Sequence, residues 1–189
     1  MTEADYMAKL KDFEGEIKFM YLDSKGYVTI GVGILLASAS AAKSAGISFK
    51  NRKTNKTATG DDIEQDYDAV KAAPKGMKEE KYKQYTQLDA TSGLDARLKK
   101  EIAKAKADAK SYYSDFDSLP DGAQWALVDI AFNTGGDGLK KFVKLKAALE
   151  KAMTSKTKED WEAAAKESHR GDIQSSRNDA IYKWIAQGC

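Results

Sequence analysis

The stretch Phe13–Gly33 constrains the fold of this chain more strongly than any other part of the sequence. Apolar residues recur three or four positions apart before it, which predicts an amphipathic helix from residue 2 to residue 14. Gly15 is typical of the position just beyond a helix C-terminus, so the helix is expected to end there. The segments Phe19–Leu22 and Tyr27–Val32 favour β-strands, and Ser24–Gly26 between them favours a turn. This stretch is therefore predicted to form a helix end followed by a tight β-hairpin.

The register of the hairpin decides which of its polar residues lie together. With a three-residue loop, Asp23 lies opposite Tyr27, and Tyr21 lies opposite Thr29. Opposite residues share a face of the sheet, as do residues two positions apart along one strand. Asp23 and Thr29 are then on one face, where Thr29 can hydrogen-bond a water molecule that Asp23 polarises. A loop of two or four residues would place them on opposite faces.

Glu14 is the predicted last residue of the helix, which gives its carboxyl group an unusual setting. The C-terminal end of a helix carries partial negative charge and disfavours ionisation of a nearby acid. Burial against Phe13, Phe19 and Tyr21 is expected to act in the same direction. A glutamic acid that stays protonated near neutral pH can act as a general acid. Backbone and hydroxyl donors at the hairpin are expected to keep Asp23 charged.

Each of these three residues also has a simpler interpretation. Glu14 can be a solvated helix end, Asp23 can be a turn former, and Thr29 can be an ordinary strand residue. The hypothesis of a glycosidase site therefore depends on the combination of the three residues and on their spacing.

Charge and composition exclude several classes of function. The sequence has 31 Lys and Arg against 29 Asp and Glu, a formal net charge of +2, which is no signature of nucleic-acid binding. His169 is the single histidine and Cys189 the single cysteine, which excludes a histidine-based triad, an intramolecular disulfide and a Cys- or His-rich metal site. Cys189 is expected to be an exposed thiol. A carboxylate-driven mechanism with no metal and no organic cofactor remains.

The rest of the sequence predicts mostly amphipathic helices. One is expected to begin near Thr59 or Asp61, after a loop or a short extra strand pair at Ile47–Thr59. The helix that follows Pro120 has almost no polar face, so it is expected to be the buried central helix. A surface loop is expected at residues 169–170. Further helices are predicted at Met77–Leu88, Leu94–Tyr113, Leu139–Met153, Lys158–Ser168 and Asn178–Ala186.

The spacing E-x8-D-x5-T, formed by Glu14, Asp23 and Thr29, resembles the catalytic signature of the phage-type lysozyme family. Flanking residues that share the resemblance are Gly15, Tyr21, Gly26, Ile30, Gly31 and Gly33. Segments similar to the central and C-terminal helices of that family are Ala126–Gly135, Trp161–Ala164 and Arg177–Asn178.

The resemblance implies an α+β, mainly helical, lysozyme-like fold in a single domain of residues 1–189. It implies a small N-terminal β-hairpin lobe at about residues 14–70. A C-terminal helical lobe is expected to comprise about residues 71–189 together with helix 1–13, and an active-site cleft is expected between the two lobes.

The resemblance further implies a muramidase that hydrolyses the β-1,4 bond between N-acetylmuramic acid and N-acetylglucosamine by an inverting route. In that reaction Glu14 protonates the leaving oxygen, while Asp23 and Thr29 position and activate the attacking water. Substrate contacts are expected from Tyr21, Gly31, Leu35, Phe132 and Asn133. A non-catalytic peptidoglycan-binding domain and a lytic transglycosylase are the alternatives.

Two departures from the family bear on the biological setting. Ile34 stands where the family often has histidine, which affects a local polar contact. The regions 37–59 and 71–110 are longer than in the small phage enzymes and differ in composition. This difference favours a secreted antibacterial toxin domain, with an immunity protein as partner, over a minimal endolysin, and a bacteriocin stays open as an alternative.

The expected partner is the peptidoglycan glycan strand, bound by a monomer, and no nucleic acid is expected. Met1–Leu10 has no signal-peptide character, and the apolar run Thr29–Ala42 is too short to span a bilayer. The protein is therefore expected to be made in the cytoplasm without membrane insertion. Delivery to the periplasm is expected through a holin, a secretion system or uptake.

Overall fold

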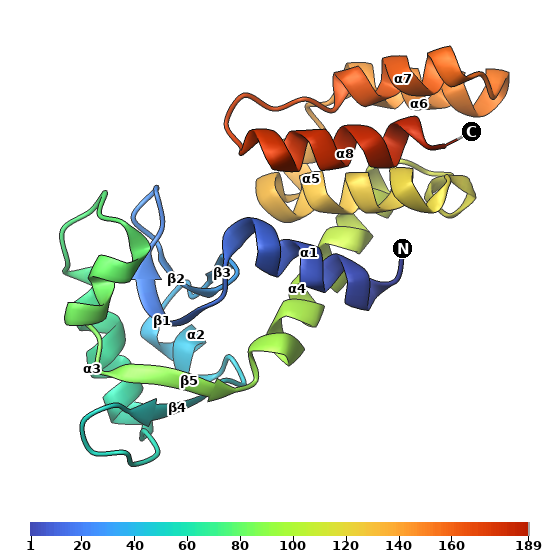
Figure 1. Cartoon of the computed structure of the whole chain (residues 1–189). Helices are drawn as coiled ribbons and strands as arrows, with labels where there is room; N and C mark the ends of the chain where they lie inside the picture. The colour runs from blue at the N-terminus through green and yellow to red at the C-terminus, as the bar shows by residue number, and fades with distance from the viewer. Residues whose placement is uncertain (189) are drawn as a thin grey trace. The chain divides into compact units, whose positions relative to one another are not determined.

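Helices dominate the chain, and its strands form two small antiparallel sheets between residues 17 and 92 (Figure 1). The computed structural model describes residues 1–188, so Cys189 and the prediction of an exposed thiol lie outside the described residues. The predicted α+β, mainly helical class, with small N-terminal sheets and a C-terminal helical region, is confirmed. No helix within residues 1–188 combines the length and the apolar character needed to cross a membrane.

The chain divides into two compact units that differ from the predicted lobes at their boundaries. Leu10–Lys100 forms one unit, called the sheet unit here. Met1–Lys9 and the described residues from Glu101 onward form the other, called the helical unit. Helices α1 (Glu3–Glu14) and α4 (Leu94–Tyr112) contribute residues to both units.

A three-stranded sheet is the first element of the sheet unit after α1. Its strands β1 (Ile17–Leu22), β2 (Val28–Gly31) and β3 (Ile34–Leu35) are antiparallel and lie in chain order. Apolar side chains make the buried part of this sheet, because β-branched and long aliphatic residues pack well on a pleated surface. The buried residues include Met20, Leu22, Val28, Ile30 and Ile34.

The second sheet pairs two segments that are far apart in the sequence. Strand β4 (Ser48–Asn51) pairs with β5 (Leu88–Ser92), and the 3-10 helix η1 (Glu79–Gln84) precedes β5. The predicted helix Met77–Leu88 is therefore wrong. Its Lys- and Glu-rich composition favours helix locally, but it forms only the short 3-10 helix η1, and its last residue, Leu88, begins β5.

Helices α2 (Ala39–Lys43) and α3 (Gly60–Lys71) complete the sheet unit. The predicted start of α3 is confirmed, because Thr59 caps it and Asp62 closes a reciprocal capping box. The hydroxyl oxygen of Thr59 accepts from the Asp62 backbone amide at 3.2 Å, and Asp62 Oδ2 accepts from the Thr59 amide at 2.7 Å.

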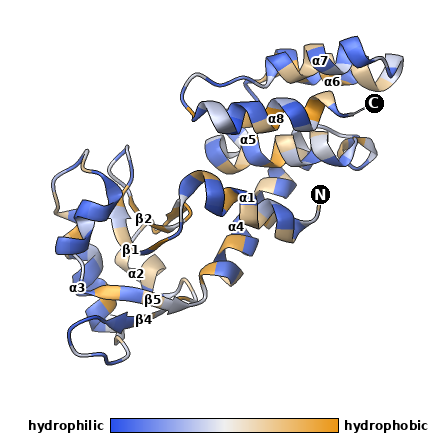
Figure 2. Cartoon of the chain, viewed as in Figure 1, coloured by the Kyte–Doolittle hydropathy of each residue, from blue (hydrophilic) through white to orange (hydrophobic). Residues whose placement is uncertain are grey.

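The helical unit is built around the predicted central helix. Helix α5 (Asp121–Leu139) is almost wholly buried from residue 125 to residue 131, which confirms that prediction, and Gly135 interrupts it with a φ of 71°. Helix α8 (Ser175–Ala186) packs on α5 and on α7 (Lys158–Glu167), and α7 also packs on α6 (Val143–Ser155). Figure 2 shows apolar and polar residues mixed along these helices, as amphipathic packing requires.

A buried ionic cluster lies inside the helical unit, between α5, α8 and the first part of α1. Asp129 on α5 is fully buried and accepts hydrogen bonds from three side chains. Arg170 Nη2 donates to it at 2.9 Å, Arg177 Nη2 donates at 2.8 Å, and the Tyr6 hydroxyl donates at 3.2 Å. Arg177 Nε also donates to both carboxylate oxygens, at 3.2 and 3.1 Å. The cluster thus joins two guanidinium groups through one carboxylate.

The surface position predicted for Arg170 is wrong, whereas His169 beside it is exposed. The Asn178 side chain holds the Arg170 backbone by accepting from its amide at 3.0 Å and donating to its carbonyl at 2.6 Å. These two hydrogen bonds orient Arg170 so that its guanidinium points inward to Asp129. Burial lowers the pKa of Arg170. Sequence alone did not reveal the inward orientation because the carboxylate partner is 41 residues away.

Candidate active site

The turn between β1 and β2 has the three-residue loop that the active-site hypothesis needs. The Asp23 amide donates to the Tyr27 carbonyl at 3.0 Å, which closes the loop of residues 24–26. Asp23 Oδ1 accepts from the backbone amides of Lys25 at 2.9 Å and Tyr27 at 2.8 Å. These two bonds fix the orientation of the carboxylate. Oδ2 accepts no hydrogen bond from residues 1–188, which leaves it to water or a ligand.

The register places the predicted hairpin residues on one face of the sheet. Tyr21 pairs with Thr29, and Thr29 pairs in turn with Leu35 on β3. Because opposite residues share a face, Asp23, Tyr21, Thr29 and Leu35 lie together on it. Tyr27, opposite Asp23, lies on the same face. The shared face of Asp23 and Thr29 is therefore confirmed.

Thr29 is 2 % exposed, and its hydroxyl donates to the Tyr27 carbonyl at 3.0 Å. Because that bond uses the hydroxyl hydrogen of Thr29, the hydroxyl oxygen can still accept a hydrogen bond from another group. Gly31, the last residue of β2, is also buried and has a φ of 67°. A side chain there would first meet Ile34 and Leu94, each at 3.4 Å from the added Cβ. The space would accept a Cβ, so it is the positive φ that favours glycine at position 31.

Glu14 is the last residue of α1, as predicted, and Gly15 follows it with a φ of 72°. The Glu14 side chain is exposed, so the predicted burial against its aromatic neighbours is wrong. Phe13 and Phe19 are half-buried, and Tyr21 is buried. The left-handed glycine ends the helix on the surface.

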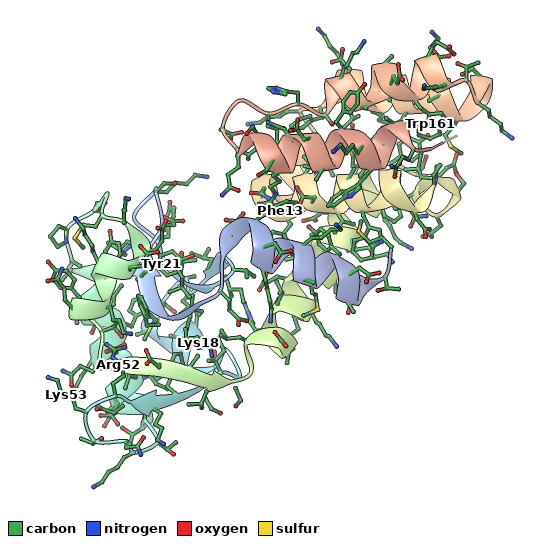
Figure 3. All side chains as sticks on the ribbon, viewed as in Figure 1. Phe13, Lys18, Tyr21, Arg52, Lys53 and Trp161 are labelled. Carbon is green, nitrogen blue, oxygen red and sulfur yellow. The ribbon has the colours of Figure 1, made fainter. Side chains whose placement is uncertain are left out.

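Tyr21 lies on β1 (Figure 3), and the negative charges of several carboxylates act on its phenol. Burial is the largest cause that raises the pKa of the Tyr21 phenol. The next causes are the negative charges of Glu14, Glu79 and Asp23, whereas a hydrogen bond with the Gly33 backbone acts in the opposite direction. The phenol therefore stays protonated at neutral pH and can donate a hydrogen bond beside two of the predicted catalytic carboxyl groups.

Phe132 and Asn133 belong to the helical unit, where both lie on α5. Phe132 is half-buried and Asn133 is exposed. The Asn133 amide donates to the Asp129 carbonyl one turn earlier, at 3.3 Å. Their predicted roles in substrate binding remain predictions.

Two residues near the hairpin received no functional role in the sequence analysis. Glu79, at the start of η1, acts on the Tyr21 phenol although it is distant in sequence. Tyr27 is 52 % exposed and lies beside Asp23. The predicted register already placed Tyr27 opposite Asp23, and position 27 shares the parity of positions 21, 23 and 29. Nothing local could have placed Glu79, since its position depends on packing between β1 and η1.

Neither the search for metal-ligand clusters nor the comparisons with known proteins identifies a further site or a family for this chain. Within residues 1–188, no group of three or more His, Cys, Asp or Glu side chains is arranged to hold a metal ion. No family model matches the chain, and a search of curated proteins likewise finds no match.

Proposed function

We propose that this protein is a peptidoglycan muramidase with a lysozyme-like fold, which hydrolyses the β-1,4 bond between N-acetylmuramic acid and N-acetylglucosamine. The observation that carries the proposal is the hairpin register, which puts Asp23, Thr29 and Tyr21 on one face. The electrostatic effect of Glu14 and Asp23 on the same buried phenol supports it, because that effect requires both carboxyl groups to lie near Tyr21.

The proposed reaction is a single displacement at the anomeric carbon. Glu14 donates its proton to the glycosidic oxygen as the bond to the leaving sugar breaks. A water molecule attacks from the opposite side of the ring, and Asp23 Oδ2 accepts the proton that this water loses. Thr29 orients the water by accepting a hydrogen bond from it. Such an inverting route requires the two carboxyl groups to be about 6.5–9.5 Å apart.

The hydrogen bonds in the hairpin suit this assignment of roles. The two backbone amides on Asp23 Oδ1 hold the carboxylate, and Oδ2 is the oxygen to which the proposal assigns the proton of the water. Exposure of Glu14 lets its carboxyl group reach a bulky polymeric substrate. The Tyr21 phenol supplies a donor that can stabilise a carboxylate after proton transfer. No metal or organic cofactor is needed for any of these steps.

The test is reducing-end release from purified peptidoglycan by the wild type and by Glu14→Gln. Glu16→Gln is the matched control, since Glu16 is an exposed carboxyl two residues away that pairs with Lys11 at 2.9 Å. We expect new muramic reducing ends of inverted anomeric configuration from the wild type and from Glu16→Gln. Glu14→Gln should lose at least about 100-fold in turnover, as removal of a general acid does.

The products separate the alternatives. Anhydro-muramic products would assign the protein to the lytic transglycosylases. Retained binding to peptidoglycan without products from any variant would identify a binding domain. Turnover by Glu14→Gln at the wild-type rate would refute the role of Glu14.

A further inference from the structure

Three polar side chains, called the clamp here, hold the connection between η1 and β5 at residues 83–89: Arg52, Asp66 and Thr86. Asp66 on α3 is 6 % exposed and Thr86 is 2 % exposed. The Thr86 hydroxyl donates to Asp66 Oδ2, and the Gln87 amide donates to Asp66 Oδ1 at 2.6 Å. One buried carboxyl group on α3 thus fixes the turn that leads from η1 into β5.

The Arg52 guanidinium caps the end of η1 from another element. Arg52 directly follows β4 and is half-buried (Figure 3). Its Nη2 donates to the Lys83 carbonyl at 2.9 Å and to the Thr86 carbonyl, and its Nη1 donates to Asp89 Oδ1 at 2.6 Å. Carbonyl groups at the end of a helix have no partner within the helix, so a planar group with several donors suits this position. The compact ammonium of a lysine could not span acceptors that the two guanidinium nitrogens reach separately.

The clamp fixes η1, and η1 in turn packs on β1. The Lys83 Nζ atom lies 5.9 Å from the centre of the Phe19 ring on β1. At the other end of η1, the negative charge of Glu79 helps to raise the pKa of the Tyr21 phenol. Both ends of η1 therefore act on the same strand, within two residues of each other.

The part of β1 that η1 contacts is irregularly paired with β2. Ile17 pairs with Gly31 and Tyr21 pairs with Thr29, so four positions along β1 correspond to two along β2. A bulge of this kind leaves residues without a regular ladder partner and changes the direction in which side chains point. The ladder alone does not fix residues 18–20, and packing against η1 supplies the missing constraint.

All three proposed catalytic residues are attached to β1. Glu14 lies three residues before the strand, Asp23 directly follows it, and Thr29 pairs within its ladder. We propose that Arg52 is a positioning residue for the proposed active site, because it holds the bulged part of β1 in place through η1. The inference rests on the proposed function. Within residues 1–188, the side-chain hydrogen bonds of the clamp go to residues 83–89 and to its own members, so its effect on the site passes through η1.

The experiment measures kcat and apparent KM on purified peptidoglycan, with the full chain, at a temperature at which circular dichroism shows each variant to be folded. Arg52→Lys keeps the positive charge and removes the planar fork. Asp89→Ala is the milder second variant, since it removes an anchor of the guanidinium and leaves Arg52 in place. Lys53→Gln is the matched charge control, because Lys53 is the exposed next residue. Thr59→Ala is the matched stability control, because it removes the cap of α3 and leaves the clamp intact.

We expect Arg52→Lys to lower kcat about tenfold with little change in apparent KM, because a displaced catalytic group costs turnover while the contacts that bind substrate remain. Asp89→Ala should lower kcat less, in the same direction. Both controls should keep the wild-type kcat, although Thr59→Ala should melt at a lower temperature. A wild-type kcat for Arg52→Lys, or an equal loss in Thr59→Ala, would overturn the inference while leaving the proposed function intact.

NMR spectra of isotope-labelled protein test the inference without turnover. A residue that only stabilises the fold leaves the native-state signals of a distant strand unchanged. We expect the backbone amide signals of Phe19, Tyr21 and Thr29 to shift in Arg52→Lys and to keep their positions in Thr59→Ala. Unchanged signals in Arg52→Lys would overturn the inference whether or not the wild type releases reducing ends. Shifted signals from a chain whose wild type releases none would support the hold of Arg52 on β1 and refute the proposed function instead.

Discussion

Replacing Asp129 by asparagine removes the negative charge that joins Arg170 and Arg177 inside the helical unit. Asp129 is 0 % exposed and both arginine side chains are 3 % exposed, so water cannot replace the lost charge. Removing one partner of a buried ion pair costs about 3–5 kcal/mol because the other charge stays buried without compensation. Asparagine has nearly the same volume, so loss of packing adds little.

Urea unfolding followed by tryptophan fluorescence measures this loss directly. Trp125, Trp161 and Trp184 are all the tryptophans of the sequence, and all lie in the same unit as Asp129. With a urea m value of about 1–3 kcal/mol/M, a loss of about 4 kcal/mol lowers the midpoint by at least about 1 M. The signal therefore reports the unit in which the charge was removed.

Two further variants make the result specific. Asp137→Asn, which removes a 96 % exposed partner of Lys140, should change stability by less than about 0.5 kcal/mol. Arg170→Met should cost less than Asp129→Asn, because Arg177 still pairs with Asp129 and the buried Arg170 Nε and Nη1, which have no hydrogen-bond partner, are removed. A midpoint for Asp129→Asn within about 0.3 M of the wild type would refute the reasoning.

Three other predictions concern the sheet unit. Thr29→Val should lower reducing-end release at least about tenfold while Thr29→Ser retains it, because only serine keeps an acceptor for the water; equal activity of both variants would contradict the role of Thr29. Burial raises the pKa of Asp66 above 3.8, so the stability that this acid contributes is present below pH 3.8 and is lost as the pH rises through its folded-state pKa. The stability of the wild type minus that of Asp66→Asn should thus fall between pH 4 and pH 7 in urea unfolding followed by circular dichroism, and a rise would refute the sign. Gly93→Ala should destabilise by about 2 kcal/mol or more in thermal unfolding, since φ is 91° and the added Cβ would lie 2.2 Å from the Gly46 carbonyl oxygen; a wild-type melting temperature would refute it.

Local signals predicted the hairpin and its flanking helix well. Gly15 ended α1, the turn at residues 24–26 set the register, and Thr59 capped α3. Each of these features depends on a few adjacent residues whose backbone preferences are strong. The face shared by Asp23 and Thr29 could therefore be derived before any tertiary contact was known.

Features that depend on distant pairing could not be derived in this way. Strand β5 is stabilised by β4, about 40 residues earlier, and its own five residues, LDATS, do not identify that partner. Arg52 illustrates the same point, because it pairs with Asp89 at 2.6 Å and donates to the carbonyl of Lys83 at 2.9 Å. The exposure of Glu14 was also missed, since the path of the chain after a helix end is set by tertiary packing and not by the amphipathic pattern.

The division of the chain has a consequence for its synthesis on the ribosome. The sheet unit is one continuous segment, so it can fold once residue 100 has emerged. The helical unit is discontinuous, and Tyr6 must wait for Asp129, 123 residues later, before their hydrogen bond can form. At about 5–20 residues per second, the apolar side of the first helix stays without its partners for several seconds. A nascent chain held at residue 110 should therefore expose the apolar side of residues 3–9 until the later helices are made.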